Sequence, residues 1–165
     1  MSQKTNDPLA SSMTTTFIAD AAAKALLDDI DDIDTINDYE STALMKAAWG
    51  GDIDAVTDLL DDGIDVNSIF AGGLTALMFA AWRGRLDTVR LLLEKGAEVN
   101  AKTAAGSTSL MCAAVMGHTD IVQILLNSGA DVDAEARNGN TAMTDATTEG
   151  RADIAQLLAQ AGCKR

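Results

Sequence analysis

The sequence predicts an all-helical protein assembled from a repeated unit, because two residue types recur at one strict spacing and the residues between them follow a helical period. The recurring residues lie 33 positions apart: Thr42, Thr75, Thr108 and Thr141, then Gly51, Gly84, Gly117 and Gly150, then Gly63, Gly96, Gly129 and Gly162. A fixed period of this length is typical of a solenoid. The composition, 47% apolar but only 4% aromatic, favours small aliphatic helices over strands.

The first 36 residues do not carry the full pattern. Residues 1–12 are polar, contain the only proline and show no period, which predicts a mobile tail. Residues 13–36 include a run of strong helix formers, and Leu26 lies 33 positions before Leu59. Ile30 stands where the turn glycine is expected. We therefore predict that residues 13–36 form a degenerate capping repeat, represented mainly by its second helix.

The first complete unit covers residues 37–69. Its opening half is predicted as a short helix from Thr42 to Trp49, ended by the pair Gly50-Gly51. The second half places apolar residues at helical spacing, in a stripe that an isolated helix pair cannot bury: Ile53, Val56, Leu59 and Leu60. Gly63 then supplies the left-handed residue that ends the second helix.

The remaining units copy this plan and then depart from it. Residues 70–102 and 103–135 repeat the apolar positions of both helices. In residues 136–165, Met143 replaces the leucine of the first helix and Thr147 replaces an alanine. A terminal repeat has one face in water, so a smaller and more polar last unit is expected of a C-terminal capping repeat.

The repeated motifs resemble those of a known family. The threonine motif reads Gly73-Leu-Thr-Ala-Leu-Met-Phe-Ala-Ala81 and Gly106-Ser-Thr-Ser-Leu-Met-Cys-Ala-Ala114, and one unit closes on Gly96-Ala-Glu-Val-Asn100. These residues resemble the ankyrin repeat family, whose unit is a β-turn followed by two antiparallel helices. The resemblance is clear from Asn37 to Gly162. It implies an all-α ankyrin repeat solenoid, with four clear repeats behind a degenerate N-terminal helical cap.

Two departures from the family pattern carry structural expectations. The family's Thr-Pro-Leu-His reads Thr-Ala-Leu-Met or Thr-Ser-Leu-Met here, so no histidine closes a hydrogen-bond network with the threonine. Met45, Met78 and Met111 are expected to fill that place with apolar packing instead. Glu40 replaces the turn glycine of the first repeat, so its leading hairpin is expected to differ in shape.

Charge and cysteine content limit the kinds of partner and the cellular compartment that we expect. With 25 acidic against 12 basic residues the net charge is −13, which disfavours nucleic acid and makes a basic protein partner electrostatically easier. The least polar N-terminal stretch, Leu9 to Leu27, is interrupted by Asp20 and Lys24, so neither a signal peptide nor a membrane span is expected. Cys112 and Cys163 suggest no disulfide framework. We expect a cytoplasmic protein without a membrane partner, monomeric by itself.

No residue set indicates catalysis or metal binding. His118 follows Gly117 without the partners of a catalytic site, so a structural role at the start of a second helix is favoured. Cys112 lies six residues earlier, but the predicted turn separates the two side chains. The acidic run from Asp28 to Asp34 lacks the glycine of a calcium loop and has isoleucines where oxygen ligands are needed. We interpret it as solvating the end of the stack, with attraction of a basic partner as the alternative. No cofactor is predicted.

The candidate site is a set of side chains outside the register of the core. Trp49 and Trp82 share one position at the end of the first helix, where no core volume is needed, which suggests an exposed apolar patch. In ankyrin proteins this position and the hairpin tips line the concave surface that binds partners. The resemblance thus implies a partner-binding groove lined by Tyr39, Trp49, Ile69, Phe70, Leu74, Trp82, Arg83, Val115 and Met116. The alternative is that these side chains pack on one another and only cover the helices.

The sequence therefore predicts a non-enzymatic protein–protein interaction module. One class that fits is an adaptor or scaffold, and the other is a dedicated inhibitor or immunity-type protein that blocks a basic active site of an enzyme or toxin. A chain that is almost all repeat favours a single dedicated partner. An enzyme is disfavoured, because the sequence shows no nucleophile, metal set or phosphate-binding loop.

Overall fold

The computed structural model describes residues 39–163, with side chains described from residue 43 onward except for Ala71. The predicted tail, residues 1–12, and the predicted capping repeat, residues 13–36, lie outside the described residues.

Short turns join the two helices of each pair, and longer segments connect one pair to the next throughout the described chain. They come in four antiparallel pairs: α3 (Tyr39–Gly50) with α4 (Ile53–Asp61), α5 (Ala76–Trp82) with α6 (Leu86–Glu94), α7 (Ser109–Met116) with α8 (Thr119–Asn127), and α9 (Ala142–Thr148) with α10 (Ala152–Gly162). A 3₁₀ turn, η2 (Ala71–Gly73), precedes α5. Among these residues the only β pairing is an isolated bridge between Phe70 and Leu74. The expected all-α repeat architecture is confirmed.

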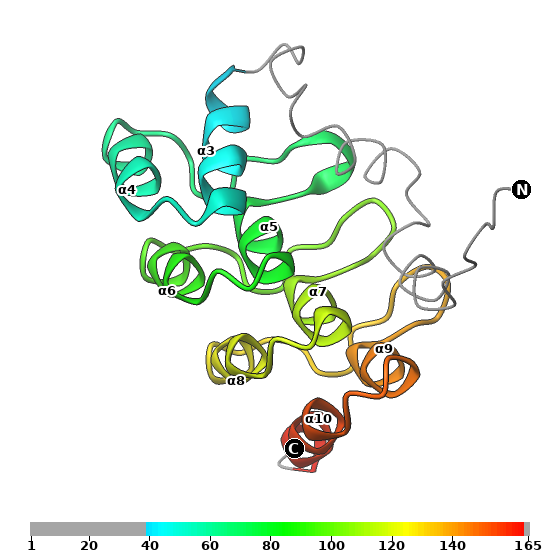
Figure 1. Cartoon of the computed structure of the whole chain (residues 1–165). Coiled ribbons are helices and arrows are strands. Elements are labelled where there is room, and N and C mark those ends of the chain that lie inside the picture. The colour runs from blue at the N-terminus through cyan, green and yellow to red at the C-terminus, as the bar shows by residue number, and fades with distance from the viewer. Residues whose placement is uncertain (1–38, 164–165) are drawn as a thin grey trace, which may run out of the picture.

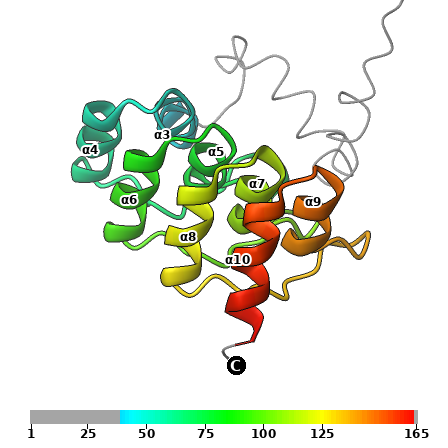
Figure 2. The same cartoon turned by 60° about the horizontal axis from the view of Figure 1, so that its bottom comes forward.

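The pairs stack in two rows (Figure 1). The first helices α3, α5, α7 and α9 pack side by side in one row, and the second helices α4, α6, α8 and α10 form the other. The turned view shows the second row from the front, with each helix beside the next (Figure 2). Since each pair packs mainly on the pairs before and after it, the core is a continuous strip along the stack.

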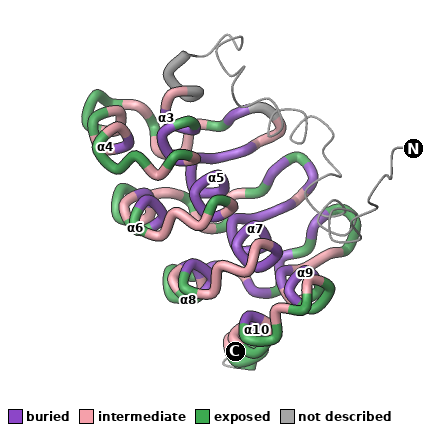
Figure 3. Tube along the Cα trace, in the orientation of Figure 1, coloured by how far each residue is buried: buried purple, intermediate pink, exposed green. Residues whose placement is uncertain are grey.

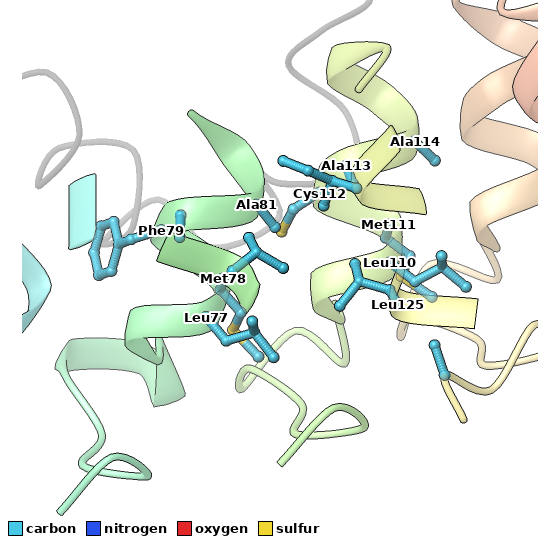
Figure 4. Close-up of a cluster of buried hydrophobic side chains, with 14 of the residues drawn as sticks. Leu77, Met78, Phe79, Ala81, Leu110, Met111, Cys112, Ala113, Ala114 and Leu125 are labelled. Atoms are coloured by element: carbon cyan, nitrogen blue, oxygen red, sulfur yellow. The ribbon is translucent and has the colours of Figure 1, made fainter. Parts of the chain in front are cut away.

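The first row forms the centre of the core. Every residue from Ala76 to Ala81 is buried, whereas the second helices keep one face exposed, as the burial colours show (Figure 3). The small alanines allow α5 to lie close to helices on both sides, and leucines and methionines fill the space toward the second row. Leu77 and Met78 from α5 gather there with Leu110 from α7 and Leu125 from α8 (Figure 4).

The recurring threonines begin the first helices. The Thr75 hydroxyl accepts a hydrogen bond from the Met78 backbone N–H at 3.3 Å, which satisfies one of the free amides of the first turn. Thr108 caps Met111 in the same way at 3.4 Å. Thr75, Thr108 and Thr141 therefore mark helix starts, as the sequence predicts, whereas Thr42 lies inside α3.

The first helix of the first repeat begins earlier than the sequence predicts. Helix α3 starts at Tyr39 rather than at Thr42, so helix occupies the place of the turn seen in the later repeats. The turn glycines Gly73, Gly106 and Gly139 have φ of 83°, 83° and 81°. Glu40 holds the equivalent place, where a side chain disfavours positive φ and glutamate favours helix. The expectation of a different leading hairpin is confirmed.

The methionines fill the core, as predicted. Met45, Met78 and Met111 are all buried in the hydrophobic cluster. In the fourth repeat Thr144 takes this position and restores a hydroxyl to it. The Thr144 hydroxyl accepts from the Thr141 backbone N–H at 2.8 Å, while the Thr141 hydroxyl accepts from the Thr144 N–H at 3.2 Å. This capping box is half exposed, in keeping with a more polar terminal unit.

Asparagines join successive repeats through paired hydrogen bonds. The Asn67 side-chain amide donates to the Gly96 carbonyl at 3.2 Å, and its oxygen accepts from the Glu98 N–H at 2.8 Å. Asn100 repeats both bonds one unit later, to Gly129 at 3.0 Å and Asp131 at 2.7 Å. In the first two repeats of the described chain, one asparagine thus fixes how the loop after the second helix sits on the next loop.

Candidate protein-binding surface

The nine residues predicted to line one groove divide by exposure. Ile69, at 68%, and Arg83 are exposed, while Trp49, Trp82 and Met116 are half-buried. The remaining described members, Phe70, Leu74 and Val115, are buried. Tyr39 begins α3, and its side chain is not among those described. Part of the set therefore forms a surface and part belongs to the core.

The hairpin residues Phe70 and Leu74 point into the protein, so their predicted place in the groove is wrong. The Phe70 N–H donates to the Leu74 carbonyl at 2.7 Å, and the Leu74 N–H donates to the Phe70 carbonyl at 3.1 Å. These bonds close the base of the turn around η2. Leu74 is only 1% exposed, and the Phe70 ring meets the Phe79 ring edge-on at 6.2 Å. Of this hairpin, only Ile69 offers a large apolar side chain to solvent.

Val115 is a second correction. It occupies the register position of the two tryptophans, but it is buried on α7, which lies between α5 and α9. A valine at this place is too short to extend beyond the neighbouring helices, whereas a tryptophan is long enough to remain half-exposed. The surface on α7 is carried instead by Met116, one residue later and half-buried.

Trp49 packs on the next repeat, as the alternative interpretation of the set proposed. Its ring meets Phe79 of α5 edge-on, with centroids 6.0 Å apart and planes at 78°. The Arg83 guanidinium carbon lies 4.5 Å from the Trp49 ring centroid. Edge-to-face aromatic pairs and cations over a ring face are both attractive. Trp49 is therefore held between a buried ring and an exposed cation, with part of its own surface uncovered.

His118 has the structural role that the sequence favours. Its Nε2 lies 3.1 Å from the Trp82 carbonyl oxygen, and Arg85, at the same register position, donates from Nε to the Trp49 carbonyl at 3.2 Å. Both side chains thus reach back to the C-terminal end of the preceding first helix, where carbonyl groups lack partners within the helix. The contact needs a glycine, since a Cβ at Gly84 would lie 2.6 Å from the His118 ring.

Cys112 does not form a nucleophilic site. Its side chain is fully buried in the cluster of Figure 4, and burial raises the pKa of the thiol far above its ordinary value, with a further contribution from the Asp145 carboxylate. A thiol that stays protonated is a poor nucleophile. Cys112 occupies the position of Phe79 in the preceding repeat and acts, like Phe79, as core.

Charged groups are distributed unevenly between the two rows. The second helix α4 and the loop after it expose a series of carboxylates: Asp52, Asp54, Asp58, Asp61, Asp62 and Asp65. By contrast, among the described side chains the exposed charged groups on α3 and at the C-cap of α5 are cations, Lys46 and Arg83. The exposed carboxylates of α4 therefore belong to the second row of helices, whereas the tryptophans belong to the first.

Two further searches of the described residues concern metal ligands and membrane-spanning helices. No group of three or more histidine, cysteine, aspartate or glutamate side chains in them is arranged to hold a metal ion. Over the same part of the chain, no helix combines the length and apolarity that crossing a membrane requires.

Comparison with known proteins agrees with the geometry. A family model described as ankyrin repeats (3 copies) matches residues 18–103 and 102–164. No curated protein matches the chain. This family model covers most of the sequence, including part of the region before α3. The helix pairs, threonine caps and 33-residue step have the form that the motifs imply. The chain belongs to the ankyrin repeat family.

Proposed function

We propose that this chain binds a partner protein through a surface formed by Trp49, Trp82, Arg83 and Met116, here named the tryptophan row. Ankyrin repeats are generally protein–protein interaction modules. The proposal assigns the contact with the partner to the tryptophan row of this stack. The observation that carries the proposal is that large apolar side chains remain half-exposed at the ends of three adjacent first helices. Ile69 extends the same apolar character to the hairpin before α5.

The row has the chemistry of a protein contact. Tryptophan and arginine are the residue types most enriched among binding hot spots, and a methionine beside them adapts to the shape of an apolar partner side chain. Trp49 is held by Phe79 and Arg83 before a partner arrives. Because the stack fixes these side chains in advance, little conformational entropy is lost on association.

Arg83 gives the row a preference in partner chemistry. Its guanidinium covers the Trp49 ring and makes no hydrogen bond to a described residue, so its N–H edges remain available. A partner carboxylate or backbone carbonyl is the matching acceptor. The exposed aspartates on and after α4 act at longer range and favour a partner whose surface is basic around that contact.

The experiment compares capture of a partner by matched variants. The double variant Arg83→Glu with Met116→Glu replaces a cation and an apolar side chain of the row by carboxylates. Neither side chain is fully buried, so the stack is expected to stay folded. Crosslinking and mass spectrometry in native lysate should find a protein captured by the wild type but not by this double variant. Asp54→Lys, on exposed α4, is the control for a charge change away from the row. A partner retained equally by all three proteins disproves the role of the row.

The alternative is a dedicated inhibitor that blocks a basic active site, and the acidic surface around the row is what favours it. The same captured partner separates the two functions. If the partner is an enzyme and adding this chain abolishes its turnover in proportion to the complex formed, the chain is an inhibitor. If the partner keeps its activity in the complex, the chain is an adaptor.

A further inference from the structure

The outer face of the first helix pair contains an apolar groove. The groove has a volume of about 550 Å³ between α3 and α4, and its apolar floor is formed by Ala43, Ala47, Ala55 and Leu59. All residues that line it belong to α3, α4 and the turn between them, the first pair of the described stack (Figure 1), and none comes from another described helix. The sequence-based candidate site did not include any of these residues.

The later repeats show which way this face points. In them, the counterparts of the four residues at steps of 33 are all at most 2% exposed: Ala76, Ser109 and Ala142; Ala80, Ala113 and Ala146; Thr88, Ile121 and Ile154; Leu92, Leu125 and Leu158. Each of those residues belongs to a pair that has another pair packed in front of it. The four positions therefore form the face that each repeat turns toward the preceding one, and in the first repeat that face is left open.

The opposite end of the stack shows which side chains this protein places on an end face that stays in water. Val56, Val89 and Val122 are fully buried, and their counterpart in the last repeat is the half-buried Ala155. Four residues further along the same helix, an exposed Ala159 stands where the other repeats have leucine. Large apolar side chains are thus replaced by alanine at the C-terminal end. The face before α3 keeps Leu59 and its groove, which indicates that it is not a solvent face.

We propose that residues 18–36 of this same chain occupy the groove as a further, shortened repeat. The ankyrin family match begins at residue 18, well before α3, so the sequence of this segment itself carries the repeat. Helix α4 packs on α6 of the next pair, and on α4 Val56 is fully buried and Leu60 is partly buried against the core. The residues 33 positions before those two are Ala23 and Leu27, both apolar.

The covalent connection favours this occupant over others. Only residues 37 and 38 separate the segment from α3, so its effective concentration at the groove is in the millimolar range or higher. A second copy of the chain would have to offer its own end face, and the C-terminal face presents Ala155 and Ala159 in place of a valine and a leucine. Docking of residues 18–36 buries Leu59 without any other molecule.

Hydrogen exchange on the full chain tests the proposal. Amides of residues 20–28 are expected to exchange at least about 100-fold more slowly than an unstructured peptide of the same sequence. Leu59→Asp places a charge in the groove and should return these amides to within about threefold of the unstructured rate. Ile53→Asp is the matched control, since Ile53 is an exposed residue of the same helix that does not line the groove.

A second variant keeps the test valid if Leu59→Asp also disturbs α4. Leu27→Asp changes only the segment, and it should speed exchange of the amides in residues 53–61 while leaving α7 and α8 unaffected. Exchange of residues 20–28 at the unstructured rate in the wild type overturns the proposal, and so does protection that survives Leu59→Asp. Protection of α4 that grows with protein concentration from about 1 to 100 µM, with a doubled mass by light scattering, also overturns it in favour of a second copy.

Discussion

The Arg83 guanidinium carbon lies 4.5 Å from the ring centroid of Trp49, which joins the end of one first helix to the end of the next. This contact has both a structural and a binding consequence. It fixes the Arg83 and Trp49 side chains relative to each other, and it leaves the guanidinium N–H groups without a hydrogen bond to a described residue. The two consequences can be separated by measuring stability and partner capture on the same variants.

Arg83→Ala is expected to lower the free energy of unfolding by about 0.5–1 kcal/mol, the usual size of an exposed cation–π contact. Arg83→Lys should lose less than Arg83→Ala, because a charge can still lie over the ring. Urea denaturation with tryptophan fluorescence measures both changes. Arg90→Ala, an exposed arginine on α6, is the control. Equal effects at Arg83 and Arg90 would show that the contact contributes nothing to stability.

Gly84→Ala is expected to destabilise the stack by about 1–3 kcal/mol, because φ is 70° there and the new Cβ would meet the His118 ring. His118→Ala alone removes the hydrogen bond to the Trp82 carbonyl and should cost about 0.5–1.5 kcal/mol.

The two substitutions should not be additive. In the double variant the ring that clashes with the new methyl group is gone, so only the backbone strain of Gly84→Ala remains. A double-mutant cycle from thermal or urea unfolding should therefore show a total cost smaller than the sum of the single costs. Strict additivity would mean that the His118 ring moves aside freely.

Cys112 makes stability depend on pH in the alkaline range. Burial raises the pKa of its thiol above the ordinary value of 9.0, so the folded chain keeps the proton that the unfolded chain releases. The stabilising contribution is complete below pH 9.0 and is lost as the pH rises above it. The loss is about 1.4 kcal/mol per pH unit until the folded thiol titrates.

The measurement is the difference in unfolding free energy between wild type and Cys112→Ala at several pH values from neutral to alkaline. This difference cancels the titration of lysine and tyrosine residues common to both proteins. The gap should narrow steadily on the alkaline side of the ordinary cysteine pKa. A gap that stays constant there would contradict the burial of the thiol.

Asn100→Ala should cost about 1–2 kcal/mol, because it removes both hydrogen bonds that tie one loop to the next. Asn100→Asp keeps the acceptor for the Asp131 N–H but loses the donor to Gly129, so a smaller loss is expected. Urea denaturation gives the order of the two variants. If Asn100→Asp is as damaging as Asn100→Ala, repulsion between the new carboxylate and the Gly129 carbonyl dominates.

Association with the captured partner should be faster at low salt. The net charge of −13 sets up a field that guides a basic surface toward the stack, and added salt screens that field. Stopped-flow association rates at two ionic strengths measure the effect, with Trp82→Ala as a variant expected to change dissociation rather than the salt dependence. A rate that does not change with salt would remove the electrostatic contribution.

The repeat period was sufficient to predict the scaffold but not which side chains are exposed. Thr75 caps its own helix through its hydroxyl, and Gly84 acts through its own backbone, so their spacing alone locates the helix start and the turn. Leu74 is different, because its burial depends on the bonds that close the hairpin onto Phe70. Those bonds form between residues that a register comparison treats as loop. Sequence reasoning therefore placed Leu74 on the surface, although it belongs to the core.

Val115 shows a second limit of prediction by register. Equivalent positions have equivalent backbones, but exposure also depends on the length of the side chain and on the neighbouring helices. Trp49 and Trp82 extend beyond the neighbouring helices, and Val115 at the same position does not. The groove at Leu59 was also not predicted from the sequence. Its residues look like ordinary core in the sequence, and only the arrangement in space shows that they lie at an open end.

The hydrogen bonds between repeats also determine how much of the chain must be synthesised before two units can pack. The side-chain hydrogen bonds from Asn67 and Asn100 span 29 and 31 residues, and those from Arg85 and His118 span 36. A ribosome adds about 5–20 residues per second, so one 33-residue unit takes about 2–7 s to emerge, far longer than a helix needs to form. Each new unit therefore meets a finished one before the next is made, and the nascent chain can grow as an ordered stack.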